Sequence, residues 1–332
     1  MALIHPDLSI SPACPDSLHS PTPAMETFRP KVLVLLASYN GAKWIGAQLD
    51  TILAQEGVDV RIIIRDDRSS DTTIEEVGRF AAETRINLLT SDKPSGSASR
   101  NFFALIHEHS SKEYDFVALA DQDDLWHQDK LARACRALQI SGAAGYSSAT
   151  IARWPTGKER LVNLSGPPNA NDFLFEGAGQ GCTFVLSAKF FERFRQFISQ
   201  HWNLIQELHF HDWAIYAIAR TWALQWYFDP TPSLIYQQHE SNDTGARGSL
   251  LGLRTRLALI RKGWYRDQLE KICLLSSAAD PSAPRTSIWR AILHEHPSWR
   301  RTARLVRFSL HAGRRRTRDQ ALLILACIAG WI

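Results

Sequence analysis

Short apolar runs alternate with segments of helical periodicity between residues 31 and 120. Residues 31–38 (KVLVLLAS) are rich in Val and Leu, which is typical of a strand that is covered on both faces. Apolar side chains then recur at helical spacing until Gly57, which predicts a helix and its end. Further strands are predicted at residues 60–65, 86–89 and 116–120, and further helices near residue 72 and over residues 100–107. This order predicts an α/β fold, in which an open, mostly parallel sheet carries helices on both faces.

Polar clusters follow three of the predicted strands directly. They are residues 38–40, residues 66–71 and residues 121–124. Open sheets of this type bind ligands at the carboxyl ends of their strands, so we expect the three segments to converge on one site. Neither G-x-G-x-x-G nor G-x-x-x-x-G-K-[ST] follows the first strand, which argues against a dinucleotide-binding fold and against a P-loop.

The acidic segment at residues 121–124 suggests how a phosphate group is held. Asp121, Asp123 and Asp124 bring three carboxylates together at the end of an apolar strand, where they repel one another unless a cation is present. Carboxylate oxygens suit Mg²⁺ or Mn²⁺, and such an ion would bridge to a diphosphate. The alternative is a solvated loop in which Asp124 or Asp129 caps the following helix.

The two ends of the chain differ from this middle part. Residues 1–29 are rich in Pro, Ser and Thr and lack the basic and apolar pattern of a signal peptide, so we expect a flexible leader. Translation from Met25 instead of Met1 is one hypothesis for this segment.

The C-terminal region, residues 248–332, is expected to be a helical extension with a basic and then apolar tail. Arginines stand at positions 300, 301, 304, 307, 314, 315, 316 and 318, and the apolar residues 321–332 follow them. This apolar segment is too short to span a bilayer, since a helix needs about 20 residues to do so. Either the tail lies in the interface of an anionic membrane, or it forms a terminal helix that packs on the protein's own core.

Composition and charge narrow the function classes. The chain has 332 residues, of which 45% are hydrophobic and 22% charged, as in ordinary globular proteins. A formal charge of +4 is too small to indicate binding of nucleic acid by the molecule as a whole. The 5 cysteines are odd in number and widely scattered, which favours neither a disulfide framework nor a thiolate metal site. We therefore expect a protein of the reducing cytoplasm.

Six motifs in unbroken order resemble family 2 glycosyltransferases of the GT-A fold. Three of them, VLLASYNG at 34–41, IIRDDRSSD at 63–71 and ALADQDDLW at 118–126, are similar to the nucleotide-sugar motifs of that family. GCTF at 181–184, HDW at 211–213 and YQQHESNDTGA at 236–246 resemble its rhamnosyltransferase-type branch, which builds bacterial surface polysaccharides. The resemblance implies a catalytic domain over residues 30–247.

The resemblance implies a nucleotide site at the first two motifs. Tyr39 would lie against the nucleobase, with Ala37 and Asn40 beside it, and Asp67 would accept a hydrogen bond from the imide N–H. Asp66 would support the ribose. Without the family, Asp67 is explained equally well as a cap for the turn into the helix near residue 72.

The resemblance also implies the metal ligand and the general base. Asp123 matches the metal ligand of the family's D-x-D element, Asp121 would face the sugar or the ribose, and Asp124 would be an auxiliary ligand of Mg²⁺ or Mn²⁺. Asp212 matches the base, at the start of a helix with an apolar stripe. An N-cap role for Asp212 is the alternative, and both descriptions are compatible because a helix start favours an ionised carboxylate.

Further substrate contacts are implied at four positions, which are Gly181, Cys182, Trp213 and His239. The glycines of residues 177–181 would let the backbone approach a sugar. Most of the tryptophans at 202, 213, 222 and 226 are explained by core packing, and we expect one or two to touch saccharide. A zinc site at His209 and His211 is disfavoured because no fourth ligand is suitably spaced.

Two segments are candidates for contacts with phosphate. Residues 239–247 are typical of a loop that closes over a diphosphate. Gln237 and Glu240 stand where family members commonly carry Arg and Gly, and Arg247 is one candidate substitute for the missing charge. Arg100, at the start of a predicted helix, is another candidate, and an ordinary exposed arginine is its alternative.

Together these features predict an inverting, metal-dependent glycosyltransferase. The resemblance favours L-rhamnose from a dTDP- or UDP-sugar donor, and a saccharide or lipid-linked oligosaccharide acceptor at the inner face of the cell membrane. Two alternatives are a nucleotidyltransferase that makes the nucleotide-sugar and a non-catalytic carbohydrate-binding protein. The first requires a Gly-rich, Lys-bearing loop after the first strand, and ASYNGAK at 37–43 matches that pattern poorly.

Overall fold

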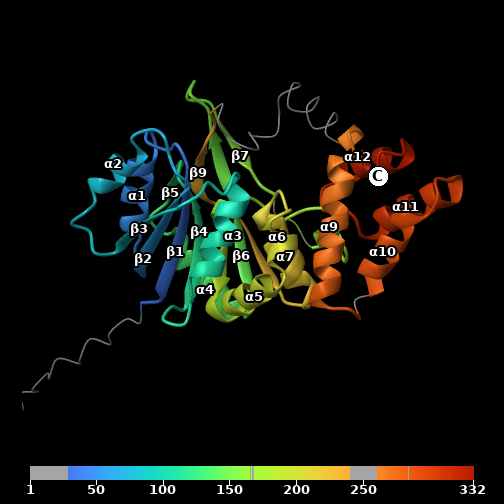
Figure 1. Cartoon of the computed structure of the whole chain (residues 1–332), viewed down its shortest axis with the longest axis horizontal. Coiled ribbons are helices and arrows are strands. Elements are labelled where there is room, and N and C mark those ends of the chain that lie inside the picture. Colours follow the sequence, from blue (N-terminus) through green and yellow to red (C-terminus); the bar gives the residue numbers. More distant parts are fainter. Residues whose placement is uncertain (1–28, 165, 167, 240–259, 283) are drawn as a thin grey trace, which may run out of the picture.

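Alternate side chains of strand β1 (Lys31–Ser38) enter two separate hydrophobic clusters. Leu33 and Leu35 belong to one cluster, and Val34 and Leu36 belong to the other. A strand whose side chains are apolar on both faces must be covered on both faces, as its sequence predicts. The computed structural model describes residues 29–164, 166, 168–239, 260–282 and 284–332 (Figure 1). The predictions for residues 1–28, Glu240 and Arg247 lie outside these described residues.

The strands of the described chain form one sheet of mixed direction. Its order is β3 (Ile86–Thr90), β2 (Asp59–Asp66), β1, β4 (Phe116–Asp121), β8 (Val185–Ser187), β6 (Gly145–Arg153), β9 (Trp226–Gln237) and β5 (Asp124–Trp126), and β7 (Glu159–Val162) pairs with β6. The pairs among β1 to β4 are parallel, as is the pair of β6 with β9. Strands β5, β7 and β8 run antiparallel to their neighbours. The predicted open α/β sheet is confirmed, but it is wholly parallel only over β1 to β4, because half of its strand pairs are antiparallel. The motif spacing does not reveal the antiparallel strand in its middle.

Helices cover both faces of the sheet. Helices α3 (Ala98–Glu108), α5 (Ala188–Gln200) and α7 (His211–Thr221) supply one hydrophobic cluster, and α1 (Ile45–Leu53) and α4 (Lys130–Ser141) supply the other. Shorter helices, α2 (Thr73–Gly78) and α6 (Trp202–Ile205), pack beside α1 and α5. Serine side chains begin two of the long helices, because Ser97 accepts from the backbone N–H of Arg100 and Ser187 from that of Phe190.

The C-terminal helices lie at the end of the molecule opposite to α1 and α2 (Figure 1). They are α9 (Trp264–Ala279), α10 (Pro284–His294), α11 (Trp299–Ala312) and α12 (Thr317–Ile328). Buried side chains of these helices, including Leu269 and Trp289, join the cluster that α3, α5 and α7 share. The helical extension is thus packed on the part of the chain that contains the sheet through a common core.

Helix α12 decides between the two expectations for the tail only in part. Leu323 and Cys327 are buried against the core, so the terminal helix does dock on the protein. On its other side, Leu325 and Ile328 are 58% and 59% exposed. Among the described residues, no helix combines the length and the apolar character needed to cross a bilayer.

Candidate active site at the carboxyl ends of the strands

The turn that follows β1 is fixed by hydrogen bonds from two other segments. The backbone N–H of Tyr39 donates to Oε1 of Gln122 (2.8 Å), and Nε2 of Gln122 donates to the Tyr39 carbonyl (2.9 Å). The Asn40 N–H donates to Ser69 Oγ (2.8 Å). Gly41 lies so close to Gln122 that a Cβ would overlap the amide. The turns after β1, β2 and β4 therefore form one connected unit, as the convergence of the three polar segments predicts.

Asp66 links the first two turns. Its carboxylate accepts from Ser38 Oγ (2.9 Å), from the Ser69 N–H (2.8 Å) and from Ser69 Oγ (2.6 Å), and the residue is fully buried. Through these bonds Asp66 holds the turns after β1 and β2 together. Its contact with a ribose stays a prediction.

Asp67 is held by the segment that precedes α3. Its carboxylate accepts from the Ser95 N–H (2.6 Å) and from Ser95 Oγ (2.7 Å), and the guanidinium of Arg65 lies 3.6 Å away. The expectation that Asp67 caps the turn into α2 is wrong, because Asp71 accepts the Thr73 N–H instead (3.1 Å). A carboxylate has acceptor capacity beyond these bonds, so a contact with an imide N–H stays a prediction.

Three other residues of the expected nucleotide site differ in exposure. The Tyr39 ring is 55% exposed, as a surface for stacking requires. Ala37 is buried within β1, so only its backbone is available to a ligand. Arg100 is exposed, and its Nε donates to the carbonyl of Gln206 (2.8 Å), which ties α3 to the segment that leads into α7.

The acidic segment brings Asp123 together with His239. Oδ2 of Asp123 lies 2.6 Å from Nε2 of His239, and Gln237 donates to the Asp123 carbonyl (2.9 Å). The His239 ring stacks on Trp44 with 4.1 Å between ring centroids. A carboxylate and an imidazole thus meet from two strand ends, and Gln237 and the Trp44 ring hold them in place. This pair of groups suits a divalent cation such as Mn²⁺.

Asp124 lies on the inner side of the same segment. Asp121, Asp124 and Cys182 also bring one ligand atom each within 4.8 Å of one another. Asp124 and Cys182 are both fully buried, and burial with the neighbouring Asp123 raises the pKa of the Asp124 carboxyl. A cation that contacts a diphosphate must be reachable, so we favour the Asp123 and His239 pair over this inner group.

The capping alternative for the acidic segment is wrong. Asp129 occupies the N-cap position of α4, but its side chain makes no capping hydrogen bond and pairs instead with Arg133 (3.1 Å).

Near Asp124, burial lowers the pKa of Lys130 to about 8, and its Nζ lies 3.8 Å from the centroid of the Trp126 ring.

Asp212 lies in the first turn of α7, next to the glycine-rich loop. The helix begins at His211, and Phe210 is its N-cap, so Asp212 is not the N-cap residue. Oδ1 of Asp212 accepts from the N–H of Trp213 (2.7 Å). A Cβ on Gly181 would lie 3.4 Å from that of Asp212. The glycine loop thus lies against the candidate base.

Two aromatic neighbours of Asp212 are packing residues. Trp213 is 5% exposed and its indole N–H donates to the Phe173 carbonyl (2.8 Å), which argues against the substrate contact expected for it. His211 stacks on Phe102 with 4.0 Å between centroids, whereas His209 lies against Trp264. The two imidazoles therefore face different elements.

A series of neighbouring residues connects the carboxylates of Asp67, Asp123 and Asp212. In the β1 register, Ser38 pairs with Asp66 on one side and Ala37 with Asp121 on the other, and neighbouring strands lie about 4.8 Å apart. Cys182 approaches Asp121, and the preceding Gly181 approaches Asp212. Asp67, Asp123 and Asp212 consequently belong to one edge of the sheet.

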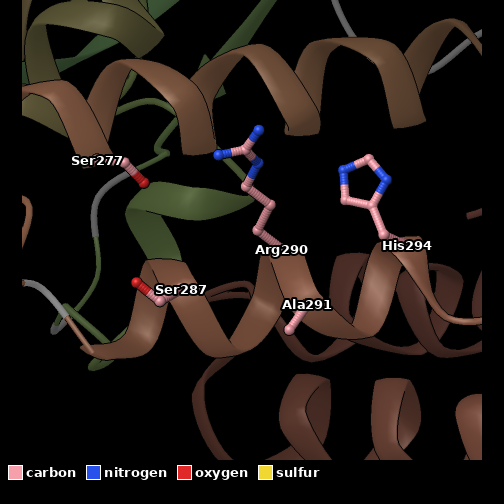
Figure 2. Close-up of a pocket in the computed structure, with 5 residues that line it drawn as sticks. All are labelled: Ser277, Ser287, Arg290, Ala291 and His294. Atoms are coloured by element: carbon pink, nitrogen blue, oxygen red, sulfur yellow. The ribbon is translucent and has the colours of Figure 1, made fainter.

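A separate hollow of about 300 Å³ lies between α9 and α10 (Figure 2). Its lining consists of Ser277, Ser287, Arg290, Ala291 and His294. None of these residues belongs to the strand ends, so the hollow is not part of the candidate active site.

The motif pattern did not identify three residues of this site. Gln122 fixes the first turn, Ser95 holds Asp67, and Trp44 stacks on His239. Trp44 is interpreted in the sequence as one apolar position of a helix, and helical spacing alone does not separate a core ring from a site ring. The position of Gln122 between two aspartates was the one available signal.

Comparisons with known proteins give matches to glycosyltransferases. The sequence model described as "Glycosyl transferase family 2" matches residues 33–176. The chain is 39% identical to the dTDP-rhamnosyl transferase RfbG of Shigella flexneri, over 74% of this chain and 86% of that protein. It is 33% identical to the Escherichia coli enzyme WfgD, a UDP-Glc:alpha-D-GlcNAc-diphosphoundecaprenol beta-1,3-glucosyltransferase, over 30% of this chain and 38% of that protein.

Solved structures share the fold at low identity. TarS 1-349 of S. aureus in complex with UDP aligns with a TM-score of 0.56 and 12% identity, covering 91% of this chain and 88% of TarS. The mannosyltransferase PcManGT of Pyrobaculum calidifontis, in complex with GDP-Man and Mn²⁺, aligns with a TM-score of 0.50 and 17% identity, covering 91% of this chain and 87% of its own.

Proposed function

Because the chain belongs to glycosyl transferase family 2, and is thus a glycosyltransferase of GT-A fold, we propose that it transfers L-rhamnose from a dTDP-sugar to a saccharide acceptor. The observation that carries the proposal is the meeting of Asp123 with His239 and of Asp212 with the glycine loop at one sheet edge. Rhamnose and the dTDP carrier are supported by the relative that is 39% identical to this chain, and a UDP-sugar is the second donor candidate. The family assignment removes support from the nucleotidyltransferase and the non-catalytic alternatives.

The nucleotide site uses the turns after β1 and β2. The exposed Tyr39 ring stacks on the pyrimidine, and the Asp67 carboxylate accepts from its imide N–H. A pyrimidine imide presents one donor between two acceptors, so a single carboxylate suffices to select that edge. Asn40 and the Ala37 backbone lie beside the base.

The residues at the ends of β4 and β9 fit a divalent cation. Asp123 and His239 would hold Mg²⁺ or Mn²⁺, with Asp121 toward the sugar and the buried Asp124 behind them. When bound, such an ion stabilises negative charge on the departing nucleoside diphosphate.

Asp212 acts as the general base of an inverting transfer. Its carboxylate takes the proton of the acceptor hydroxyl, whose oxygen attacks the anomeric carbon from the face opposite the diphosphate. Its place in the first turn of α7 favours the ionised form, because the N-terminal end of a helix stabilises negative charge. Gly177 and Gly181 bring the backbone of the glycine loop into close contact with the first turn of α7, next to this carboxylate.

The acceptor is lipid-linked in this proposal, and the reaction takes place at the cytoplasmic face of the cell membrane. Helix α11 exposes Trp299 and the arginines 300 and 307, and α12 exposes Leu325 and Ile328. Exposed apolar side chains beside arginines fit the interface of an anionic membrane. The product would belong to a bacterial surface polysaccharide, as an O-antigen or exopolysaccharide.

The test of this proposal is the Asp212→Asn variant of the full chain. We would measure dTDP release from dTDP-L-rhamnose with Mn²⁺ and a short-chain N-acetylglucosaminyl diphosphate lipid as the acceptor probe. The variant should lose transfer, by roughly 100-fold or more for a general base, while binding dTDP as the wild type does. Retained turnover would remove Asp212 from the role of base.

Membrane contact is tested by the double variant Leu325→Glu and Ile328→Glu. Both side chains are exposed, so the change leaves the core intact, whereas deletion of the tail would also remove the buried Leu323. The variant should sediment less with vesicles containing phosphatidylglycerol than the wild type does. Leu161→Glu, an equally exposed site on β7, is the control, and equal sedimentation of all three proteins would contradict membrane contact.

A further inference from the structure

The connection between α11 and α12, residues 313–316, reaches back to the segment that precedes the glycine loop. Arg314 donates to the carbonyl of Phe175 through Nε and Nη2 (3.3 and 3.1 Å), and Asn169 donates to the carbonyls of Gly313 and Arg314 (3.3 and 3.1 Å). The two segments are about 140 residues apart in the sequence but bind each other through backbone and side chains. The connection between the C-terminal helices therefore contacts the segment that leads into the glycine loop.

Arg315 makes the most extensive of these contacts. Its side chain is 3% exposed; Nη1 lies 2.8 Å from Asp172 Oδ2 and Nη2 donates to the carbonyl of Gly177 (2.6 Å). The backbone N–H of Arg315 donates to Oε1 of Glu176 (2.6 Å). A planar guanidinium fits this set, because its N–H groups point at a carboxylate and a carbonyl at once.

The same segment is bound from its other side by α7. Asp172, which is fully buried, accepts from the hydroxyl of Tyr216 (2.8 Å) and pairs with Arg220 (2.8 Å). The indole N–H of Trp213 donates to the carbonyl of Phe173. Residues 172–177 are thus held between α7 and the α11–α12 connection by buried charges and hydrogen bonds.

Gly177 connects the 172–177 segment with the first turn of α7. A Cβ on Gly177 would lie 3.3 Å from both the N and the Cα of Trp213, so the glycine backbone rests on the residue next to Asp212. The carbonyl of this glycine is the group that Arg315 fixes. We propose that Arg315 is a positioning residue, which sets the place of Asp212 by clamping the 172–177 segment against α7.

This inference rests on the proposed role of Asp212 and goes beyond it. It makes the C-terminal helices part of the catalytic machinery, in addition to any contact with a membrane. The prediction is specific to the acceptor side, since Tyr39, Asp67 and Asp123 are fixed by other segments, at residues 122, 95 and 237.

The experiment compares Arg315→Lys with the wild type in the full chain. Lysine keeps the positive charge beside Asp172 and so protects the fold, but it cannot bind both Asp172 and the Gly177 carbonyl in the guanidinium geometry. We expect kcat for dTDP release with the N-acetylglucosaminyl diphosphate probe to fall about 10- to 100-fold. The Kd of dTDP with Mn²⁺ and the KM of dTDP-L-rhamnose should stay within about twofold of wild type, as for a change that acts on the acceptor side alone. Arg136→Lys, at an exposed arginine of α4, is the matched control.

Hydrogen exchange supplies a readout that does not depend on activity. In Arg315→Lys, the amides of residues 177–181 and 211–216 should exchange faster, whereas those of the turns after β1 and β2 should not change. Unchanged exchange at residues 211–216, or an equal increase over the whole chain, would overturn the positioning role. So would a dTDP affinity that falls as much as kcat does.

The outcomes also separate this inference from the proposed function. If Asp212→Asn loses transfer and Arg315→Lys behaves as wild type, only the positioning role fails. If Asp212→Asn keeps its turnover, the proposed base fails whatever Arg315→Lys does.

Discussion

Gly181→Ala is the substitution that tests the packing of the glycine loop against the candidate base. The added methyl group would lie well inside contact distance of Nε2 of His211, 3.1 Å from its Cε1 and 3.4 Å from Cβ of Asp212. Either the His211 ring or the first turn of α7 must move to admit it. The ring is not easily displaced, because it stacks on the fully buried Phe102 with 4.0 Å between centroids.

The shift needed to relieve the overlap is about 1 Å, and a misplacement of that size at a reacting group costs roughly 100-fold in rate. The cost in stability is smaller. An extra methyl group in a packed region usually costs about 1–3 kcal/mol. We therefore expect kcat to fall about 100-fold while the protein stays folded at the assay temperature and its affinity for dTDP is retained.

The assay is steady-state release of dTDP from dTDP-L-rhamnose, with Kd for dTDP measured in parallel by calorimetry. Gly46→Ala in α1 is the matched control, because no atom lies within 4 Å of its Cβ position and alanine is favoured over glycine in a helix. A Gly181→Ala enzyme with the kcat of wild type would refute the argument that this loop and Asp212 share a packed boundary.

Two more predictions follow from exposure and from burial. Tyr39→Ala should weaken dTDP binding roughly 5- to 100-fold in calorimetry, as loss of aromatic stacking on a base does. Tyr39→Phe is the control and should bind dTDP within about twofold of wild type. Equal affinities of wild type and Tyr39→Ala would exclude stacking on this ring. Burial lowers the pKa of His211 from 6.5 to about 3, so between these pH values the unfolded chain binds more protons than the folded one and stability falls as the pH decreases. His211→Phe should therefore flatten the decline of Tm from pH 6.5 toward pH 3, and a decline as steep as that of wild type would show that His211 does not cause it.

The parallel half of the fold is readable in the sequence where a strand is apolar on both faces, as β1 and β4 are. Residues 31–38 form β1 with the same bounds, since continuous apolar runs of this length have few other ways to be buried. The short strand β8 is less visible. Residues 182–186 are mainly apolar, but Gly181–Thr183 forms a 3₁₀ turn, and only Val185–Ser187 pairs with β4.

The site was predictable where a residue type and its place at a strand end agree. Asp67 and Asp123 follow buried strands, and the turns that carry them are fixed as these positions suggest, whereas Asp212 lies in the first turn of α7. Contacts between distant segments were not predictable. Nothing in the local sequence indicates that Ser95 binds Asp67 or that Arg315 reaches Gly177, because these pairs form only when the sheet and the C-terminal helices have packed.

Trp213 illustrates why burial must be known before a role is assigned. The motif places it beside the base, yet its ring lies in the core and its N–H is bonded to Phe173. The ring that stacks on His239, beside the proposed metal site, is Trp44, which helical spacing favours as a core residue. An aromatic residue at helical spacing gives the same sequence pattern whether its ring lies in the core or at a functional site.

The most direct test of the account is a calorimetric titration of dTDP into wild type and Asp123→Asn, each with Mn²⁺ and with EDTA. If Asp123 and His239 hold the ion that contacts the diphosphate, Mn²⁺ should tighten binding to wild type by about 10-fold or more, as loss of a metal-site residue typically costs. The same ion should have no effect on Asp123→Asn, whose affinity in EDTA should equal that of wild type. Equal weakening of the variant with and without Mn²⁺ would contradict a metal-held diphosphate at this edge of the sheet.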